Sequence, residues 1–203
     1  ETILHSNDSG IAEQHAQKLA KEQGKIYVSP YNDPQIIAGQ GTLAIELLDQ
    51  LPRLDVVYVS IGGGGLISGI GSVLKAFSPK TRVVGVSAKN SAELAASIRA
   101  GKMVKVDHHE TLADGCAGGV DSDTITLGLG SEVIDDLIDC SEGQIESGLQ
   151  QIAWSEKMLV EGSAGLAYAA WQEDARKNKN KISAVVLCGA NFDKETLSPI
   201  FNS

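Results

Sequence analysis

Short apolar runs alternate along the chain with segments in which apolar residues recur every three or four positions. The runs predict β-strands, and the periodic segments predict amphipathic helices. Val56–Ile61 and Ala184–Leu187 are almost continuously apolar, which is typical of parallel strands covered on both faces. This alternation predicts an α/β fold with a mainly parallel, twisted sheet flanked by helices. Further runs predict three more strands, at Thr2–His5, Lys25–Ser29 and Arg82–Ser87.

The first two predicted helices have clear starting signals. Asp8 or Ser9 can cap a helix that runs to Gln23, because their side-chain oxygens can accept hydrogen bonds from the first free N–H groups. Asp33 and Pro34 have the residue types of a helix cap and a first helical residue.

Three more helical segments follow in the sequence. Thr42–Leu51 carries apolar residues at helical spacing. Ser141, with Gln144 three residues later, has the pattern of a capping box and predicts a helix that runs to about Val160. The Ala-rich stretch Ser163–Ala175 predicts another helix.

The composition narrows the classes of partner. The chain has 203 residues, of which 42% are hydrophobic and 21% are charged, as in a globular protein with a real core. A formal net charge of -9 repels nucleic acid and anionic membranes, so we expect neither as a partner. The sequence has no apolar run of membrane-spanning length and does not begin with a signal-peptide pattern.

The three cysteines Cys116, Cys140 and Cys188 are widely spaced and form no CxxC pair. This spacing argues against a zinc site or a disulfide framework, and it favours a reducing compartment, so we expect a cytoplasmic protein. Cys140 is interpreted as a small buried apolar residue.

The strongest local signal is the run Gly62–Gly65, which follows a predicted buried strand and precedes Leu66 and a predicted helix. Such a loop can turn several N–H groups toward one point at a helix N-terminus, where they and the helix dipole bind phosphate. A flexible strand–helix turn is the simpler alternative, although two glycines would serve for it. No Lys-Ser/Thr follows, so this is not a Walker loop, and Ser87 at the end of the next strand argues against a dinucleotide loop.

Five motifs, in order, resemble the serine/threonine dehydratase (threonine ammonia-lyase) and serine racemase family of fold-type II pyridoxal-phosphate enzymes. The tetraglycine loop resembles the phosphate cup of that family, and the other four resemble the segment before the cup, two loops near the cofactor ring, and the strand end that meets the pyridine nitrogen. The four are Ser29–Pro34 with Ile37–Thr42, Thr111–Gly115, Val160–Gly165 and Leu187–Asn191.

The resemblance implies a fold like that of the tryptophan synthase β chain. Residues 1–34 would then be the tail of a smaller domain, and residues 35–203 most of the larger cofactor-binding domain. For the cofactor, pyridoxal 5'-phosphate, it implies contacts from Gly62, Gly63, Gly64, Gly65, Leu66, Gly115, Glu161 and Cys188.

Cys188 and Glu161 can each be interpreted in two ways, as a cofactor-site residue or, in the plain interpretation, as a residue with no role in the site. Cys188 ends an apolar strand and precedes Gly189, so its thiol can face a crevice at the carboxyl edge of the sheet. In the family, a Ser or Cys there leaves the pyridine nitrogen unprotonated, which weakens the electron sink and suits elimination; an inert buried cysteine is the alternative. Glu161 is expected near the ring or its lysine, or else as an exposed helix-end carboxylate. Tyr31, Asn32 and Asp33 can face the substrate, although Asp33 also fits a helix cap.

Two family features are absent from the sequence. The Ser-Phe-Lys-like motif that carries the cofactor lysine is missing, and so is the Ser-Ser-Gly-like loop that binds the substrate carboxylate. The resemblance implies that both lie upstream of Glu1, so we expect no catalytic residue in this chain. A missing N-terminal segment, or a separate full-length chain, would supply them.

The resemblance also bears on metal and substrate. Some members bind a divalent cation through a Glu at the position of Ser87, and Glu93 lies six residues further on, so we expect no metal site. The Val86-Ser87-Ala88 variant resembles a subgroup linked to hydroxyectoine breakdown.

As a whole, the resemblance implies a dehydratase that converts a hydroxy amino acid such as threonine or serine to a 2-oxo acid and ammonia, within a homo-oligomer. A racemase, a β-replacement enzyme and a non-catalytic partner chain are the alternatives.

Overall fold

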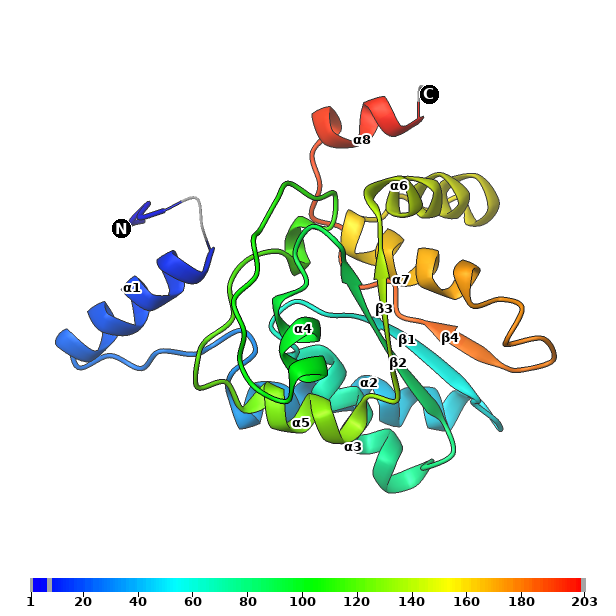
Figure 1. Ribbon diagram of the computed structural model, residues 1–203, viewed down its shortest axis with the longest axis horizontal. Helices are drawn as coiled ribbons and strands as arrows, with labels where there is room; N and C mark the ends of the chain where they lie inside the picture. Colours follow the sequence, from blue (N-terminus) through cyan, green and yellow to red (C-terminus); the bar gives the residue numbers. More distant parts are fainter. Residues whose placement is uncertain (1, 7–8, 202–203) are drawn as a thin grey trace.

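The computed structural model describes residues 2–6 and 9–201, and Figure 1 shows a sheet with helices on both of its faces. The described residues form one sheet of four strands in the order β3-β2-β1-β4, and every neighbouring pair is parallel. The predicted α/β class is therefore confirmed. The strands are β1 Val56–Ser60, β2 Arg82–Ala88, β3 Asp136–Cys140 and β4 Ser183–Val185.

Helices cover the sheet because the strands are apolar on both sides. In β1, Val57 and Val59 pack with α2 and α3 in one core, whereas Val56 and Tyr58 pack with α6 and α7 in the other. The helices are α1 Ser9–Glu22, α2 Pro34–Gln50, α3 Gly65–Phe77, α4 Glu93–Ala100, α5 Ile125–Val133, α6 Glu142–Gln151, α7 Gly162–Glu173 and α8 Lys194–Phe201, with a 3-10 turn η1 Asp114–Cys116 and a π turn η2 Ile152–Glu156. None of the helices described here is long and apolar enough to cross a membrane.

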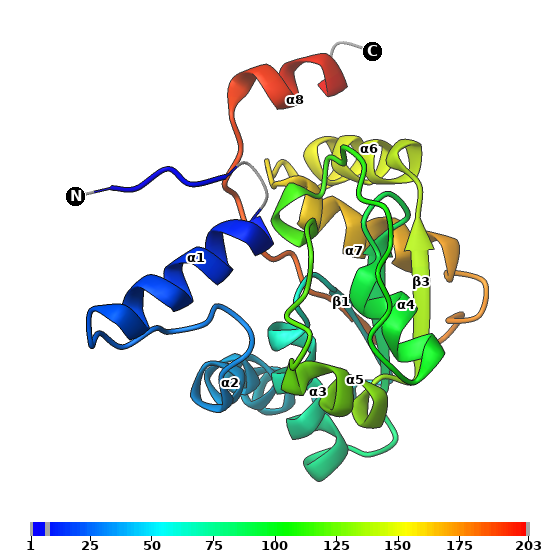
Figure 2. The ribbon, with the colours of Figure 1, turned by 60° about the vertical axis from the view of Figure 1, so that its left-hand side comes forward.

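The two strands predicted near the N-terminus are wrong. Residues 2–5 and 25–29 are extended but pair with no strand of the described chain, and their apolar side chains stay in water, with Leu4 95% and Ile26 91% exposed. Helix α1 lies between them, buries no residue and projects from the body (Figure 2). Of its two predicted caps, Asp8 lies outside the described residues. The domain division after residue 34 stays a prediction.

The capping signals predicted where these helices begin better than where they end. Asp33 caps α2, accepting hydrogen bonds at Oδ1 from Gln35 N–H (2.7 Å) and Ile36 N–H (3.2 Å). The capping box of Ser141 is also present at the start of α6. The predicted end at about Val160 is wrong: α6 passes into η2, and the left-handed backbone of Lys157 (φ 59°) ends the helical path.

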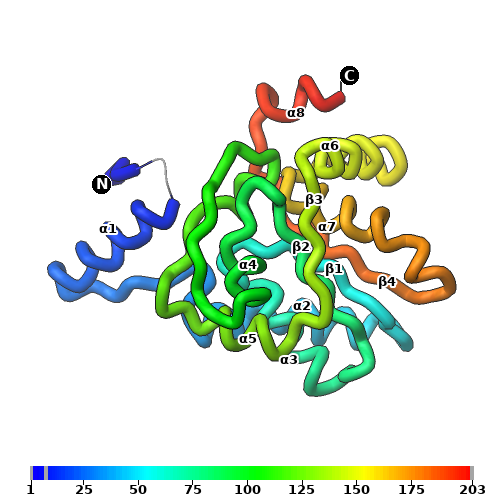
Figure 3. The backbone as a smooth tube through the Cα atoms, in the orientation of Figure 1, coloured from blue at the N-terminus to red at the C-terminus, as the bar shows by residue number. Residues whose placement is uncertain are grey.

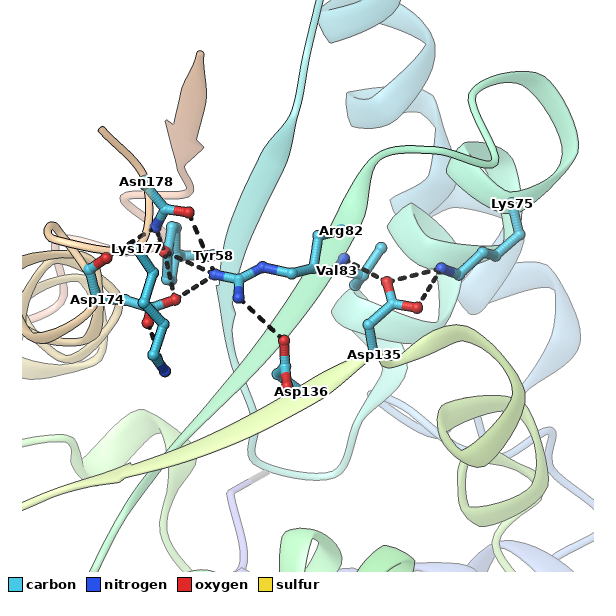
Figure 4. Close-up of polar contacts among 9 residues, drawn as sticks. All are labelled: Tyr58, Lys75, Arg82, Val83, Asp135, Asp136, Asp174, Lys177 and Asn178. Atoms are coloured by element: carbon cyan, nitrogen blue, oxygen red, sulfur yellow. Dashed lines mark hydrogen bonds and ion pairs between the residues drawn. The ribbon is translucent and has the colours of Figure 1, made fainter. Parts of the chain in front are cut away.

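A polar network holds the amino end of the sheet (Figure 4). The buried Asp174, at the C-terminal end of α7, pairs with Arg82 from the start of β2 and with Lys177 (2.9 Å). Tyr58 donates to the Asp174 carboxylate (3.0 Å) and accepts a hydrogen bond from Asn178. Burial alone would raise the pKa of Asp174, but hydrogen bonds from Lys177, Arg82 and Tyr58 outweigh it and lower the pKa to about 2. The network therefore holds an ionised carboxylate inside the fold.

Candidate functional site

A cavity of about 580 Å³ lies at the opposite, carboxyl end of the strands. This is where open α/β sheets bind their ligands, because the loops that leave the strands diverge there. The structure brings all eight predicted site residues together around the cavity, although they come from four separate parts of the sequence. They are Gly62, Gly63, Gly64, Gly65, Leu66, Gly115, Glu161 and Cys188.

The tetraglycine loop leaves its N–H groups open to this cavity. The Ile61 N–H still donates to the Val86 carbonyl (2.7 Å), and the Ser68 N–H is the next to find an acceptor, the Gly64 carbonyl (3.0 Å). Between these two residues, no backbone N–H of the described chain has a protein acceptor. Gly64 adopts a left-handed conformation (φ 84°) at the start of α3, and a Cβ there would collide with Leu94. Free N–H groups at a helix N-terminus are able to bind an anion, so this geometry suits the predicted phosphate loop.

Tyr31 forms one wall beside this loop. Its side chain packs against the glycines, and a Cβ on Gly65 would lie 2.9 Å from the Tyr31 Cα. The Tyr31 hydroxyl accepts a hydrogen bond from the Asp121 N–H (2.9 Å), and burial raises the pKa of Tyr31. Asn32 donates to the Asp121 carboxylate (3.2 Å), and Asp33 caps α2. Of these three predicted substrate-facing residues, Tyr31 lines the cavity.

Glu161 enters the cavity from the start of α7. Its carboxylate accepts a hydrogen bond from the Asn191 N–H (2.8 Å) and lies between Gly115 and Gly189. Gly189 has a left-handed backbone (φ 97°), and a Cβ there would collide with the Glu161 carboxylate. Glu161 is a half-buried helix-end residue whose carboxylate reaches the cavity, so it is not the exposed carboxylate of the plain interpretation. Its expected place near the cofactor ring stays a prediction.

Cys188 contributes a neutral thiol. Burial raises its pKa, the nearby Glu161 carboxylate raises it further, and a hydrogen bond with Ser60 opposes both effects. The Ser60 hydroxyl donates to the Ser163 carbonyl (2.6 Å) and lies in the same cavity wall. At neutral pH the Cys188 thiol, whose pKa is raised, is therefore protonated.

Sequence reasoning missed three residues of this wall: Ser60, Cys116 and Ser163 all line the cavity. Burial raises the pKa of Cys116 to about 12, and the buried Ser163 hydroxyl has no hydrogen-bond partner among the described residues. Ser60 directly precedes the loop region and Cys116 directly follows Gly115, so proximity to the motifs was the available signal. No lysine is among the described residues that line the cavity.

Comparison with known proteins identifies the family. A model of the pyridoxal-phosphate-dependent enzymes matches residues 1–189. The chain belongs to this family. The L-threonine ammonia-lyase of Thermotoga maritima is 33% identical over 202 residues, which cover 100% of this chain and 50% of that protein. The catabolic L-threonine dehydratase TdcB of Escherichia coli is also 33% identical over 202 residues, covering 98% of this chain and 61% of that protein.

Solved structures give the same result. The processed form of threonine deaminase isoform 2 from Solanum lycopersicum superposes with a TM-score of 0.88 at 29% identity, covering 98% of this chain and 59% of that one. Maize serine racemase superposes with a TM-score of 0.82 at 30% identity, covering 92% of this chain and 58% of that one. The chain thus has the fold of these fold-type II enzymes and spans half to three fifths of the length of these relatives.

Proposed function

We propose that the intact protein is a pyridoxal-phosphate-dependent dehydratase that removes the β-hydroxyl of a hydroxy amino acid, such as serine or threonine, to give a 2-oxo acid and ammonia. One observation carries the proposal: a loop of unpaired N–H groups and a neutral thiol line the same cavity. The names of the threonine ammonia-lyase and threonine dehydratase relatives support the same reaction class.

The tetraglycine loop suits the cofactor phosphate. Its N–H groups lack protein acceptors, and the dipole of α3 adds a partial positive charge at the same place. Phosphate binding there needs only backbone donors, so Gly62–Gly65 and Leu66 would hold the group without a charged side chain. This accounts for a phosphate cup without a Lys or Arg in the loop.

The thiol of Cys188 suits the cofactor ring. When bound, pyridoxal phosphate supplies an electron-withdrawing ring that stabilises negative charge at the α-carbon of the amino acid. A protonated thiol is uncharged, so Cys188 would contact the ring nitrogen without holding a proton on it as an aspartate would. An uncharged contact of this kind would favour prompt loss of a β-substituent from the bound amino acid.

Proton transfer at the α-carbon requires a base that the described cavity walls do not provide. No lysine lines the cavity, and both thiols have raised pKa values. We therefore place the cofactor lysine and the substrate-carboxylate site outside residues 1–203. The Glu161 carboxylate remains available to hold or orient a proton near the ring.

The test is product analysis with the intact protein and added pyridoxal phosphate. With L-serine and L-threonine we expect equal amounts of ammonia and 2-oxo acid. Formation of the D-enantiomer without ammonia would instead make the protein a racemase, an alternative that the similarity to maize serine racemase favours. An intact protein that binds the cofactor but releases no product would support a non-catalytic partner chain.

A further inference from the structure

A buried carboxylate lies behind the cavity wall, outside the site described above. Glu93 opens α4, and its side chain is only 1% exposed. A buried charge is costly unless it is paired and hydrogen-bonded. The Glu93 carboxylate has three partners: Lys105 Nζ (3.0 Å), His108 Nε2 (3.0 Å) and the Val120 N–H (3.1 Å).

All three partners belong to the segment that joins α4 to α5, traced in green in Figure 3. The middle of this segment, residues 114–119, lines the cavity. Lys105 and His108 precede that lining stretch, and Val120 follows it, so one carboxylate holds the stretch from both sides. Residues 102–111 form a mostly exposed loop, and the contacts of Lys105 and His108 with Glu93 anchor this loop to the interior.

A second contact ties the network to the cavity wall itself. The Ser91 hydroxyl accepts a hydrogen bond from the Gly118 N–H (3.0 Å) and shares another with His108 Nδ1 (2.8 Å). His108 therefore bridges Ser91 and Glu93. Because Gly118 lines the cavity, a change at Glu93 is passed to the site through packed, hydrogen-bonded neighbours.

We propose that Glu93 is a positioning residue that holds the cavity-lining segment 114–119 in place, and that Lys105 is its built-in counter-cation. Lys105 is the cationic partner of the buried carboxylate, and its 3.0 Å contact joins Glu93 to the stretch that precedes the cavity wall. The proposal deepens the proposed function, because it concerns the wall of the same site.

The charge state of Glu93 agrees with this arrangement. Burial alone would raise the pKa of Glu93, but the Val120 N–H, Lys105 and His108 outweigh burial and lower it. Among the described residues, the side chains that contact this carboxylate are those of Lys105 and His108. Removing Lys105 therefore leaves His108 and the Val120 N–H as its partners.

The test substitutes Lys105, whose side chain is 75% exposed, so the fold should survive. In the intact protein, amide hydrogen exchange of residues 114–120 and affinity for inorganic phosphate are measured, each as a ratio to wild type. With Lys105→Met we expect exchange to accelerate about fivefold or more, with phosphate affinity falling in parallel. Lys105→Arg should restore wild-type values.

Two controls make the result decisive. Lys102→Met removes an equal charge from the exposed start of the same segment and should change neither ratio. In the Glu93→Gln background, Lys105→Met should have no further effect, because the carboxylate it balances is gone. An exchange ratio for Lys105→Met equal to that of Lys102→Met would overturn the proposal. The exchange measurement needs no cofactor and no turnover, so it stands apart from the test of the dehydratase activity.

Discussion

The two ends of the sheet treat polar groups in opposite ways. At the amino end, Arg82, Tyr58 and Asp174 satisfy one another inside the protein. At the carboxyl end, the N–H groups of residues 62–66 and the Ser163 hydroxyl have no partner among the described residues and border a cavity. Groups that are paired internally stabilise the fold, whereas groups left unpaired at a cavity are available to a ligand. Within this one sheet, the polar groups at the amino end therefore stabilise the fold, and those at the carboxyl end are free to contact a ligand.

Chain direction explains which charges stand at which end. In a parallel sheet with helical crossovers, helices begin near the carboxyl ends of the strands and end near the amino ends. The starts of α3 and α7 therefore bring partial positive charge to the cavity, which favours an anion. The end of α7 brings partial negative charge to the other edge, where the cations Arg82 and Lys177 gather.

The largest effect is expected from Gly64→Ala in the cavity loop. Alanine is strained at the left-handed φ of 84°, and its Cβ would collide with Leu94, so the N–H groups must shift. Because a misplacement of about 1 Å can cost on the order of a hundredfold in rate, we expect a loss of that order in ammonia release by the intact protein. Phosphate affinity, measured by titration, should fall as well.

Gly101→Ala is the matched control for this change. Gly101 has a similar φ of 66°, but a Cβ there meets nothing within 4 Å. It should lower the free energy of unfolding by about 1 kcal/mol and leave phosphate affinity unchanged. Equal affinities for the two alanine variants would show that the tetraglycine loop is not the anion site.

The next largest effect is expected from Asp174→Asn at the amino end of the sheet, and it concerns the free energy of unfolding alone. The pKa of Asp174 is lowered to about 2 in the folded protein, against about 4 when unfolded, so its contribution is complete above about pH 4 and is lost as the pH falls through 2. Asp174→Asn should lower the free energy of unfolding at pH 7 by about 2 kcal/mol and flatten its fall between about pH 4 and pH 2. Urea denaturation over this range measures both.

The control for this prediction shares the same arginine. Asp136 pairs with Arg82 at 3.1 Å but is half exposed, so Asp136→Asn should cost less than about 1 kcal/mol. Neither variant should change phosphate affinity. A large affinity loss in Asp174→Asn would mean that the two ends of the sheet are coupled.

A smaller effect is expected from Ser60→Ala at the carboxyl end. Without the Ser60 hydroxyl, which lowers the pKa of Cys188, less thiolate forms. Alkylation of Cys188 by iodoacetamide at pH 8 should slow by about threefold, as followed by peptide mass mapping. Ser72→Ala, which removes a similar hydroxyl-to-carbonyl bond on α3, should leave the rate unchanged. Faster alkylation in Ser60→Ala would contradict the assigned hydrogen bond.

The smallest effect is expected from divalent cations. Ser87 offers a neutral hydroxyl where a metal-binding carboxylate would stand, and Glu93 is already paired with Lys105 and His108. Magnesium or calcium should therefore change the activity of the intact protein by less than about twofold, because a hard cation needs several oxygen ligands. Strong activation that a chelator reverses would show that a cation site exists.

Local patterns predicted the central part of the fold. The apolar run at 56–61 and the glycines after it located β1 and the cavity loop, because both depend on neighbouring residues alone. Strand β3 was missed because Asp136 and Asp139 interrupt its apolar pattern, and these residues form ion pairs with Arg82 and Arg99.

Contacts distant in sequence could not be predicted in this way. Ser60 is 103 residues from Ser163, the residue whose carbonyl it meets, and no spacing rule links the two. Glu93 was considered only as a metal ligand, because its burial and its partners depend on the folded loop. The resemblance to a known family, rather than periodicity, brought Glu161 and Cys188 into the predicted site.

The bare apolar segments before α2 have a consequence for the behaviour of the isolated chain in solution. Leu4 and Ile26 lie in extended stretches that pair with no strand of the described chain. These exposed apolar stretches can associate with other chains, as exposed edge strands do. The net charge of -9 keeps molecules apart only while it is unscreened. Added salt shortens the Debye length to about 10 Å at 0.1 M, so the colloidal stability of this chain should decrease as ionic strength rises.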